Sequence, residues 1–223
     1  MSAVRRVPAG SDPVVEAIRG AIVSGEYVPD QRLVEADLAE RFAAGRAAVR
    51  SALIQLGNEG LVERIPNRGA RVRAVSLAEA IEITEVRMVI EGLCAAKAAR
   101  RVTGAEIMEL REIRERMAAA VGAGAVVTYS ELNHRLHRRM LEMSGQRTAE
   151  GVIERLRGQS VRHRFRLAMR PGRPSVSLPE HLAIIDALCG RDPDAAERAA
   201  RNHLGSVIRA LRDTGNSTSI PVS

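Results

Sequence analysis

The sequence predicts a mainly α-helical protein, with an N-terminal winged helix-turn-helix domain followed by an all-α helical bundle. Apolar residues recur at helical spacing through most of the 223 residues. Only one pair of segments, on either side of a Pro-Asn-Arg-Gly turn, alternates with the period of two that is typical of strands. The pattern changes near residue 74. We therefore expect domains at residues 1–74 and 75–213, and a flexible tail at 214–223.

Three short helices and a hairpin are expected in the N-terminal domain. Ser11 and Asp12 form a cap before Pro13, which suits a first-turn position, and Gly25 ends this first helix. Gly45 and Gly60 delimit the third helix. The expected elements are helices from Pro13 to about Gly25, at 35–42 and at 46–58, and strands at 61–65 and 70–73 joined by a turn at 66–69.

Helix caps divide the second half of the chain. Ser76, Thr103 and Ser177 each stand three residues before a glutamate, which is the pattern of a capping box. Asp192 followed by proline opens the last helix. The expected helices cover residues 76–100, 104–120, 124–144, 148–170, 177–189 and 193–213, with a loop at 171–174.

The amino-acid composition limits the functions that the chain can have. The net charge is +7 and Lys97 is the only lysine, so the basic residues are nearly all arginines, which favour phosphate and guanine recognition. Aromatic residues make up only 2%, which argues against a platform for stacking single-stranded nucleic acid. Two distant cysteines and the absence of an apolar N-terminal run predict a cytoplasmic protein that does not bind membranes.

Basic residues gather at the third helix and the hairpin. Arg46 and Arg50 lie one turn apart, opposite the apolar stripe of the helix, and a recognition helix enters the major groove with its first turns. Residues 42–74 hold six arginines and two acids, which favours DNA binding over a merely solvated basic face. A glycine at the hairpin tip permits close backbone approach to DNA. The candidate DNA-binding residues are Arg46, Arg50, Arg68, Gly69 and Arg71.

From about Pro13 to Arg73 the chain resembles the DNA-binding domain of the GntR family. The resemblance rests on Gly25-Glu-Tyr-Val-Pro29, Asp37-Leu38-Ala39, Arg46, Arg50, Glu59-Gly60-Leu61-Val62 and Arg68-Gly69-Ala70. It implies that Arg46 and Arg50 contact the operator and that Gly69 reaches the minor groove.

Three histidines lie on inward faces of different predicted helices. His137 follows Asn133 by one turn, so both side chains can point to one place. His181 shares a face with isoleucine and leucine residues, and His203 shares one with alanine, valine and leucine. Buried histidines need partners. Separate hydrogen bonds in the core and one shared zinc, nickel, copper or iron ion both satisfy that need, and the pattern leaves both open.

Residues from about Ala80 to Arg212 resemble the FCD effector domain of the FadR subfamily. The matching pieces are Glu85-Val-Arg87, Glu91, Asn133, Leu136-His137, Glu180-His181 and Arg201-Asn-His203-Leu204. In that subfamily an aspartate and three histidines often hold a divalent metal that helps bind a small carboxylate. The resemblance therefore implies a metal site, with zinc favoured over nickel or other transition metals, at Asn133 in the aspartate position, His137, His181 and His203.

Arg87 has two interpretations: a clamp for the effector carboxylate, or an i, i+4 partner of Glu91 at a helix surface. The leading function is a ligand-responsive transcriptional repressor that binds a palindromic double-stranded operator as a homodimer and responds to a small organic acid. The alternatives are a metal-responsive regulator without an organic effector and a metal-dependent hydrolase. No convincing general base stands beside the histidines, which disfavours the hydrolase, so we expect no enzyme activity.

Overall fold

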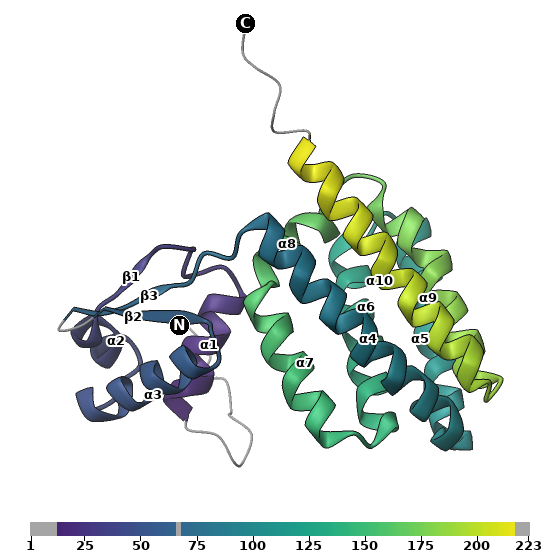
Figure 1. Ribbon diagram of the computed structural model, residues 1–223, viewed down its shortest axis with the longest axis horizontal. Helices are drawn as coiled ribbons and strands as arrows, with labels where there is room; N and C mark the ends of the chain where they lie inside the picture. Colours follow the sequence, from purple (N-terminus) through teal and green to yellow (C-terminus); the bar gives the residue numbers. More distant parts are fainter. Residues whose placement is uncertain (1–12, 66–67, 217–223) are drawn as a thin grey trace, which may run out of the picture. The chain divides into compact units, whose positions relative to one another are not determined.

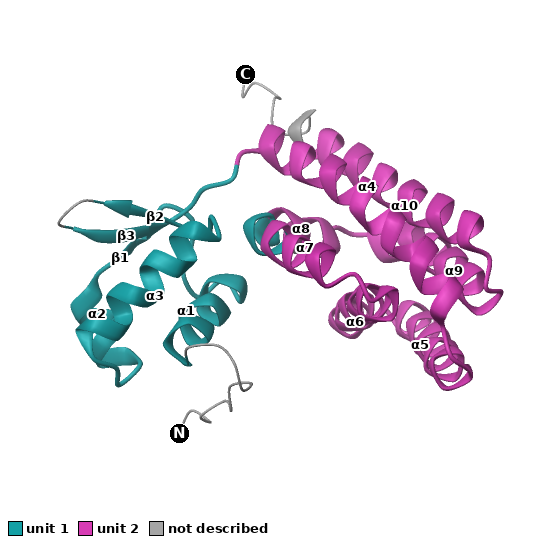
Figure 2. Cartoon of the chain, turned by 60° about the horizontal axis from the view of Figure 1, so that its bottom comes forward, with its two compact units in different colours: residues 1–75, 157–162 teal, residues 76–156, 163–223 magenta. Residues whose placement is uncertain are grey.

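The computed structural model describes residues 13–65 and 68–216 of the chain (Figure 1). Its contacts divide the chain into two compact units (Figure 2). Unit 1 comprises the chain up to Val75 together with Arg157–Arg162, and unit 2 comprises Ser76–Leu156 and the residues from His163 onward. Within the described ranges, no helix is both long and apolar enough to cross a membrane.

Unit 1 is a winged helix-turn-helix fold, as predicted. Its sheet has the order β1-β3-β2 with antiparallel pairing, and Ile65 of β2 faces Gly69 of β3 across the hairpin. The two-residue strand β1 was not predicted, because two residues are too short to show a period. The elements are α1 (Pro13–Val23), β1 (Arg32–Leu33), α2 (Glu35–Arg41), α3 (Arg46–Asn58), β2 (Val62–Ile65) and β3 (Gly69–Val72).

The core of unit 1 forms where the three helices and the sheet meet. Ile18 of α1, Leu38 of α2 and Leu56 of α3 are at most 2% exposed and belong to one apolar cluster with Leu33 of β1. The apolar face of α3 is thereby buried, which leaves its opposite face to solvent.

Unit 2 is an all-α bundle, as predicted. Helices α4, α6, α9 and α10 lie side by side (Figure 1), and α5 packs against α6 and α9. The core contains Ile113 and Met117 of α5, Met140 of α6 and Ile185 of α9, all fully buried. The helices are α4 (Leu77–Arg101), α5 (Gly104–Gly122), α6 (Val126–Ser144), α7 (Arg147–Gln159), α8 (Val161–Ala168), α9 (Arg173–Cys189) and α10 (Pro193–Asn216).

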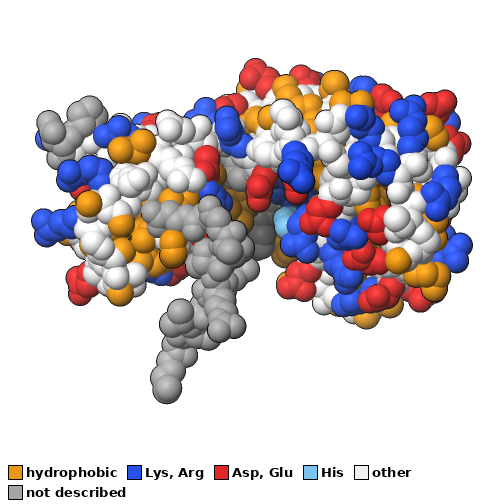
Figure 3. Space-filling view, turned by 90° about the horizontal axis from the view of Figure 1, so that it is seen from below, with side chains coloured by type: hydrophobic (Ala, Val, Ile, Leu, Met, Phe, Trp, Pro, Cys, Tyr) orange, Lys and Arg blue, Asp and Glu red, His pale blue; other side chains and the backbone are white. Residues whose placement is uncertain are grey.

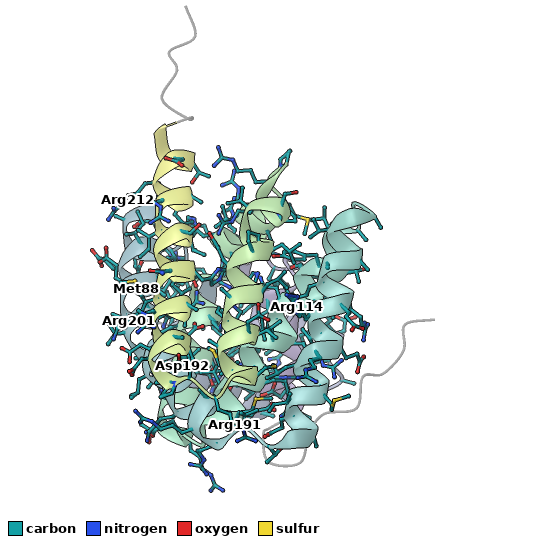
Figure 4. All side chains as sticks on the ribbon, turned by 90° about the vertical axis from the view of Figure 1, so that its right-hand side faces the viewer. Met88, Arg114, Arg191, Asp192, Arg201 and Arg212 are labelled. Atoms are coloured by element: carbon teal, nitrogen blue, oxygen red, sulfur yellow. The ribbon has the colours of Figure 1, made fainter. Side chains whose placement is uncertain are left out.

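Three of the predicted caps form. The Ser76 hydroxyl accepts a hydrogen bond from the backbone of Glu79, and Thr103 and Glu106 make a complete capping box. The Asp192 carboxylate accepts from the backbone N–H of Ala195 at the start of α10, beside the turn labelled in Figure 4. These caps satisfy backbone donors that a helix cannot satisfy itself.

The structure corrects two predicted helices. The expected helix at 148–170 is interrupted at Ser160 and forms α7 and α8, and Gly158 just before the break has a low helix propensity. The expected cap at Ser177 is wrong, because α9 begins at Arg173, four residues earlier, with a proline in its first turn. The Ser177 hydroxyl lies inside α9 and donates to the Arg173 carbonyl at 3.0 Å.

Candidate functional site

The start of α3 presents the predicted reading residues to solvent. Gly45 is the N-cap in extended conformation. Because glycine has no side chain, no cap hydrogen bond reaches the backbone N–H groups of the first turn. Arg46 and Arg50 are exposed, whereas Val49 between them is fully buried. In the space-filling view, arginine side chains gather at the left-hand edge of unit 1 (Figure 3). The surface of unit 2 in the same view mixes both signs of charge.

Two of the candidate arginines are held by carboxylates. Arg50 donates through Nη2 to Glu35 of α2 at 2.8 Å, and this hydrogen bond lowers the pKa of the Glu35 carboxyl. Arg71 of β3 donates to Glu63 of β2 at 2.7 Å. Both pairs are exposed, so water screens them and DNA phosphates can replace the carboxylates. Glu35 therefore contacts one of the predicted reading residues, a pairing that the sequence did not predict.

The wing depends on Gly69. Its φ is +87°, and a Cβ atom at this position would lie 2.4 Å from the Leu33 carbonyl oxygen. Any other residue would therefore strain the backbone and collide with β1. Arg68, exposed beside it, has its carbonyl bonded by the Arg32 side chain at 3.3 Å. Pro66 and Asn67 of the predicted turn lie outside the described residues.

The three predicted histidines come together in unit 2. His137 of α6, His181 of α9 and His203 of α10 are at most 4% exposed, and one ring nitrogen from each lies within 4.8 Å of the others. The ring centroids are 4.3 Å apart for His181 and His203, and 5.2 and 5.5 Å for the other two pairs. We call these residues the three-histidine cluster. In the described part of the chain, this group of possible metal ligands contains no carboxylate.

Carboxylates orient two of the rings from behind. His137 Nδ1 is 2.8 Å from Glu91 Oε2 of α4, and His203 Nδ1 is 2.9 Å from Glu180 Oε2 of α9. An ionised carboxylate only accepts, so both Nδ1 atoms carry the hydrogen when the rings are neutral. Burial would raise the pKa of Glu180, but hydrogen bonds from His203 and Ser206 outweigh it and lower the pKa. Nε2 is then the nitrogen left to bind a ligand.

A chain of hydrogen bonds fixes the third ring. The Ser177 hydroxyl donates to the Arg173 carbonyl, so it must accept from the Tyr129 hydroxyl, 2.8 Å away. Tyr129 in turn accepts from His181 Nδ1, also at 2.8 Å. Burial raises the pKa of Tyr129 to about 12, which keeps the phenol protonated. Burial also lowers the pKa of His181 well below its usual range, so this ring is neutral with its lone pair on Nε2.

The buried polar atoms without a hydrogen-bond partner among the described residues include His181 Nε2 and, one turn before His137 on α6, Asn133 Oδ1. Leaving such atoms unsatisfied is costly, so they indicate a missing ligand. Three imidazole nitrogens and one amide oxygen suit zinc and neighbouring transition metals. The residues present therefore fit a divalent metal ion.

The chain matches two bacterial protein families in succession. Residues 11–72 match the bacterial regulatory proteins of the gntR family, and residues 82–206, more than half of the chain, match the FCD domain. The chain belongs to the GntR family and carries an FCD domain. It is thus a DNA-binding transcriptional regulator, as the resemblance implied.

Whole-length relatives support this assignment. The HTH-type transcriptional repressor RspR of Escherichia coli strain K12 is 29% identical over 199 residues, which cover 89% of this chain and 87% of the relative. The Glc operon transcriptional activator of the same strain is 25% identical, covering 90% and 88%. The solved structure of E. coli McbR/YncC has a TM-score of 0.77 at 21% identity, covering 91% and 97%, and therefore shows the same fold. These relatives are regulators and not enzymes.

Arg87 of this GntR-family regulator lies behind the cluster. Its guanidinium is 2.8 Å from Glu91, the carboxylate that orients His137, and both side chains are almost completely buried. The predicted pair with Glu91 is therefore present, but in the interior and not at a helix surface.

The sequence did not reveal the roles of Glu91, Glu180, Tyr129 and Ser177. In the sequence, Glu91 was paired only with Arg87, and Ser177 only with Glu180 in the expected capping box.

Proposed function

We propose that this regulator binds a short palindromic operator as a homodimer and releases it when a small carboxylate metabolite binds near a divalent metal. Residues 1–74 read the DNA, and residues 75–213 form the effector and dimerisation domain, followed by the tail at 214–223. The single observation that carries the effector half is the buried three-histidine cluster, whose rings are held with Nε2 available. Repression is supported by similarity to a repressor along most of the chain.

DNA reading is assigned to Arg46 and Arg50 in the major groove, and to Arg68, Gly69 and Arg71 at the wing. The first two are exposed at the start of α3, where a recognition helix meets base edges. Gly69 allows β3 to approach the backbone of β1, because a Cβ atom there would collide with the Leu33 carbonyl oxygen. The minor groove is assigned to this end of the wing on the resemblance to the family.

Dimerisation is supported by an apolar stripe on α4. Val86, Val89 and Leu93 are each about half exposed, and their spacing of three and four residues places them on one helical face. Such a stripe is typical of a helix that packs against a partner. Two copies related by a twofold axis present two recognition helices, and a palindromic operator mirrors that symmetry.

Effector binding is assigned to the metal centre formed by Asn133 and the three-histidine cluster. A bound divalent ion would supply a Lewis-acidic position for a carboxylate oxygen. Arg87 supports this centre by holding Glu91, and an effector carboxylate would contact Arg87 only by displacing Glu91. A ligand that binds one arrangement of the dimer better than another shifts the population that can bind DNA.

Selection of bound sites from a random pool of double-stranded DNA tests the proposal. We expect an enriched site of two inverted half-sites, bound by two chains. Arg50→Ala should weaken binding to that site by about tenfold or more and relax the preference at one position in each half-site. Arg116→Ala is the matched control, because Arg116 also pairs with a glutamate on an exposed helix, in unit 2. An enriched site without inverted symmetry, or equal binding by both variants, would contradict the proposal.

A further inference from the structure

The donors at the three-histidine cluster carry no negative charge. Imidazole binds metals in its neutral form, and the partners at Nδ1 leave Nε2 of each ring as the nitrogen that can bind a metal. The fourth candidate donor, Asn133, offers an amide oxygen, which is buried and lacks a hydrogen-bond partner. No carboxylate belongs to the group of possible ligands found among the described residues at this place.

The two carboxylates behind the cluster are already neutralised by arginines. Glu91 lies 2.8 Å from Arg87, and both side chains are at most 4% exposed. Glu180 lies 3.5 Å from Arg173, whose side chain is 10% exposed and whose Nη1 donates to a serine. Each negative charge therefore has a positive partner within the protein, and neither is left to balance a metal ion.

A divalent ion at this place would bring two positive charges into the interior without an anionic ligand. Burial of an unbalanced charge is costly, whereas a carboxylate bound to the ion removes part of that charge. We propose that the centre binds its metal ion and a carboxylate ligand as mutually dependent partners, because the protein's own donors are neutral. The inference rests on the proposed metal centre, and it makes the regulator respond to the metal and the organic acid together.

The dependence has to act in both directions. If a carboxylate raises the affinity for the metal, the metal raises the affinity for the carboxylate by the same factor. Asn133 determines the size of this factor, because a carboxylate at its position would supply the missing negative charge from within the chain. The coupling should therefore shrink in Asn133→Asp.

The zinc affinity of the full chain tests this inference. It is measured on metal-stripped protein by competition with a chromophoric chelator. The probe is acetate, compared with perchlorate at the same ionic strength, because perchlorate coordinates metals weakly. We expect acetate to raise the zinc affinity of the unaltered chain by about tenfold or more. Cobalt in place of zinc gives a second readout, since its visible absorption changes when a carboxylate enters the coordination sphere.

Two variants locate the effect. Asn133→Asp should bind zinc more tightly without acetate and reduce the acetate effect to less than about threefold. Asn202→Asp adds the same charge at an exposed position of α10 and should keep the full acetate effect. If Asn133→Asp fails to fold, the acetate effect on the unaltered chain still decides the matter.

The outcomes separate this inference from the proposed function. Tight zinc binding without an acetate effect overturns the mutual dependence but leaves the metal centre standing, and favours a regulator that responds to metal alone. No zinc binding with or without acetate overturns the metal centre itself. An unchanged acetate effect in Asn133→Asp overturns the assignment of the coupling to the neutral donors.

Discussion

One kind of ion pair, between arginine and glutamate, occurs at both candidate sites in opposite surroundings. At the reading surface, Arg50 Nη2 and Glu35 Oε2 are 2.8 Å apart, and their side chains are 63% and 25% exposed. Behind the three-histidine cluster, Arg87 Nη2 and Glu91 Oε1 are also 2.8 Å apart, but the side chains are 4% and 0% exposed. Because the two distances are equal, the pairs differ in how far water reaches them and not in the length of the contact.

Each pair suits the unit in which it lies. An exposed pair contributes little to stability and is screened by salt, so its arginine can exchange a carboxylate for DNA. A buried pair is strongly destabilised when one partner is removed, because the other charge remains in the interior. The exposed pair is therefore suited to a surface that would bind and release DNA. The buried pair is suited to holding Glu91, and through it the ring of His137, in one position.

Removal of Glu91 should have the largest effect. Glu91→Ala leaves Arg87 buried without its partner and removes the acceptor that orients His137. We expect the free energy of unfolding of the metal-free protein to fall by about 3–5 kcal/mol, measured by urea denaturation.

The control is Glu112→Ala, because Glu112 forms an i, i+4 pair with Arg116 in which both side chains are more than half exposed. That variant should change the unfolding free energy by less than about 0.5 kcal/mol. Equal losses in the two variants would mean that burial does not distinguish the pairs.

The hydroxyl of Tyr129 should matter next. Tyr129→Phe removes the acceptor that holds the hydrogen of His181 on Nδ1, so Nε2 is no longer fixed as the lone-pair nitrogen. We expect zinc affinity to fall by about 10- to 100-fold in the chelator competition. Tyr27→Phe, in unit 1, is the matched control and should leave zinc affinity unchanged. A zinc affinity of Tyr129→Phe within about twofold of that of the unaltered protein would remove Tyr129 from the support of this site.

The parts of the fold that follow local rules could be predicted from the sequence. Most helices could be predicted from helical periodicity and from the caps at Ser76, Thr103 and Asp192. Such predictions succeed because a cap acts within a few residues of its own helix. The start of α9 could not be predicted, since Ser177 resembles a cap but bonds to Tyr129, 48 residues away in the chain. Tertiary contacts outweighed the local pattern there.

The same limit applies to the three-histidine cluster. The inward faces of three predicted helices placed the histidines in the core, and the resemblance to the FCD domain assigned them to one site. Their partners could not be chosen from the sequence, because Glu91 lies 46 residues from His137 and Tyr129 lies 52 residues from His181. Packing of α4, α6 and α9 selects those partners, and no local spacing encodes it.

The smallest expected effect concerns the exposed pair. Glu35→Gln removes the charge that holds Arg50 and should leave stability nearly unchanged, since the pair is largely solvated. The freed guanidinium should raise affinity for random-sequence DNA by roughly twofold to fivefold at low salt. Because every DNA sequence offers phosphates, the ratio of specific to non-specific affinity should fall.

Glu40→Gln separates this local effect from the change in net charge. Glu40 lies on the same helix α2 and is exposed, so the variant alters the long-range field of unit 1 to a similar extent but leaves the bond between Glu35 and Arg50 in place. We would measure the DNA affinity of both variants by titration with random-sequence and selected DNA. The titrations would be repeated over a range of salt concentrations. If both variants gain affinity equally, Glu35 acts only through its charge. A gain confined to Glu35→Gln means that Glu35 competes with DNA for Arg50 and thereby restrains binding to the wrong sequences.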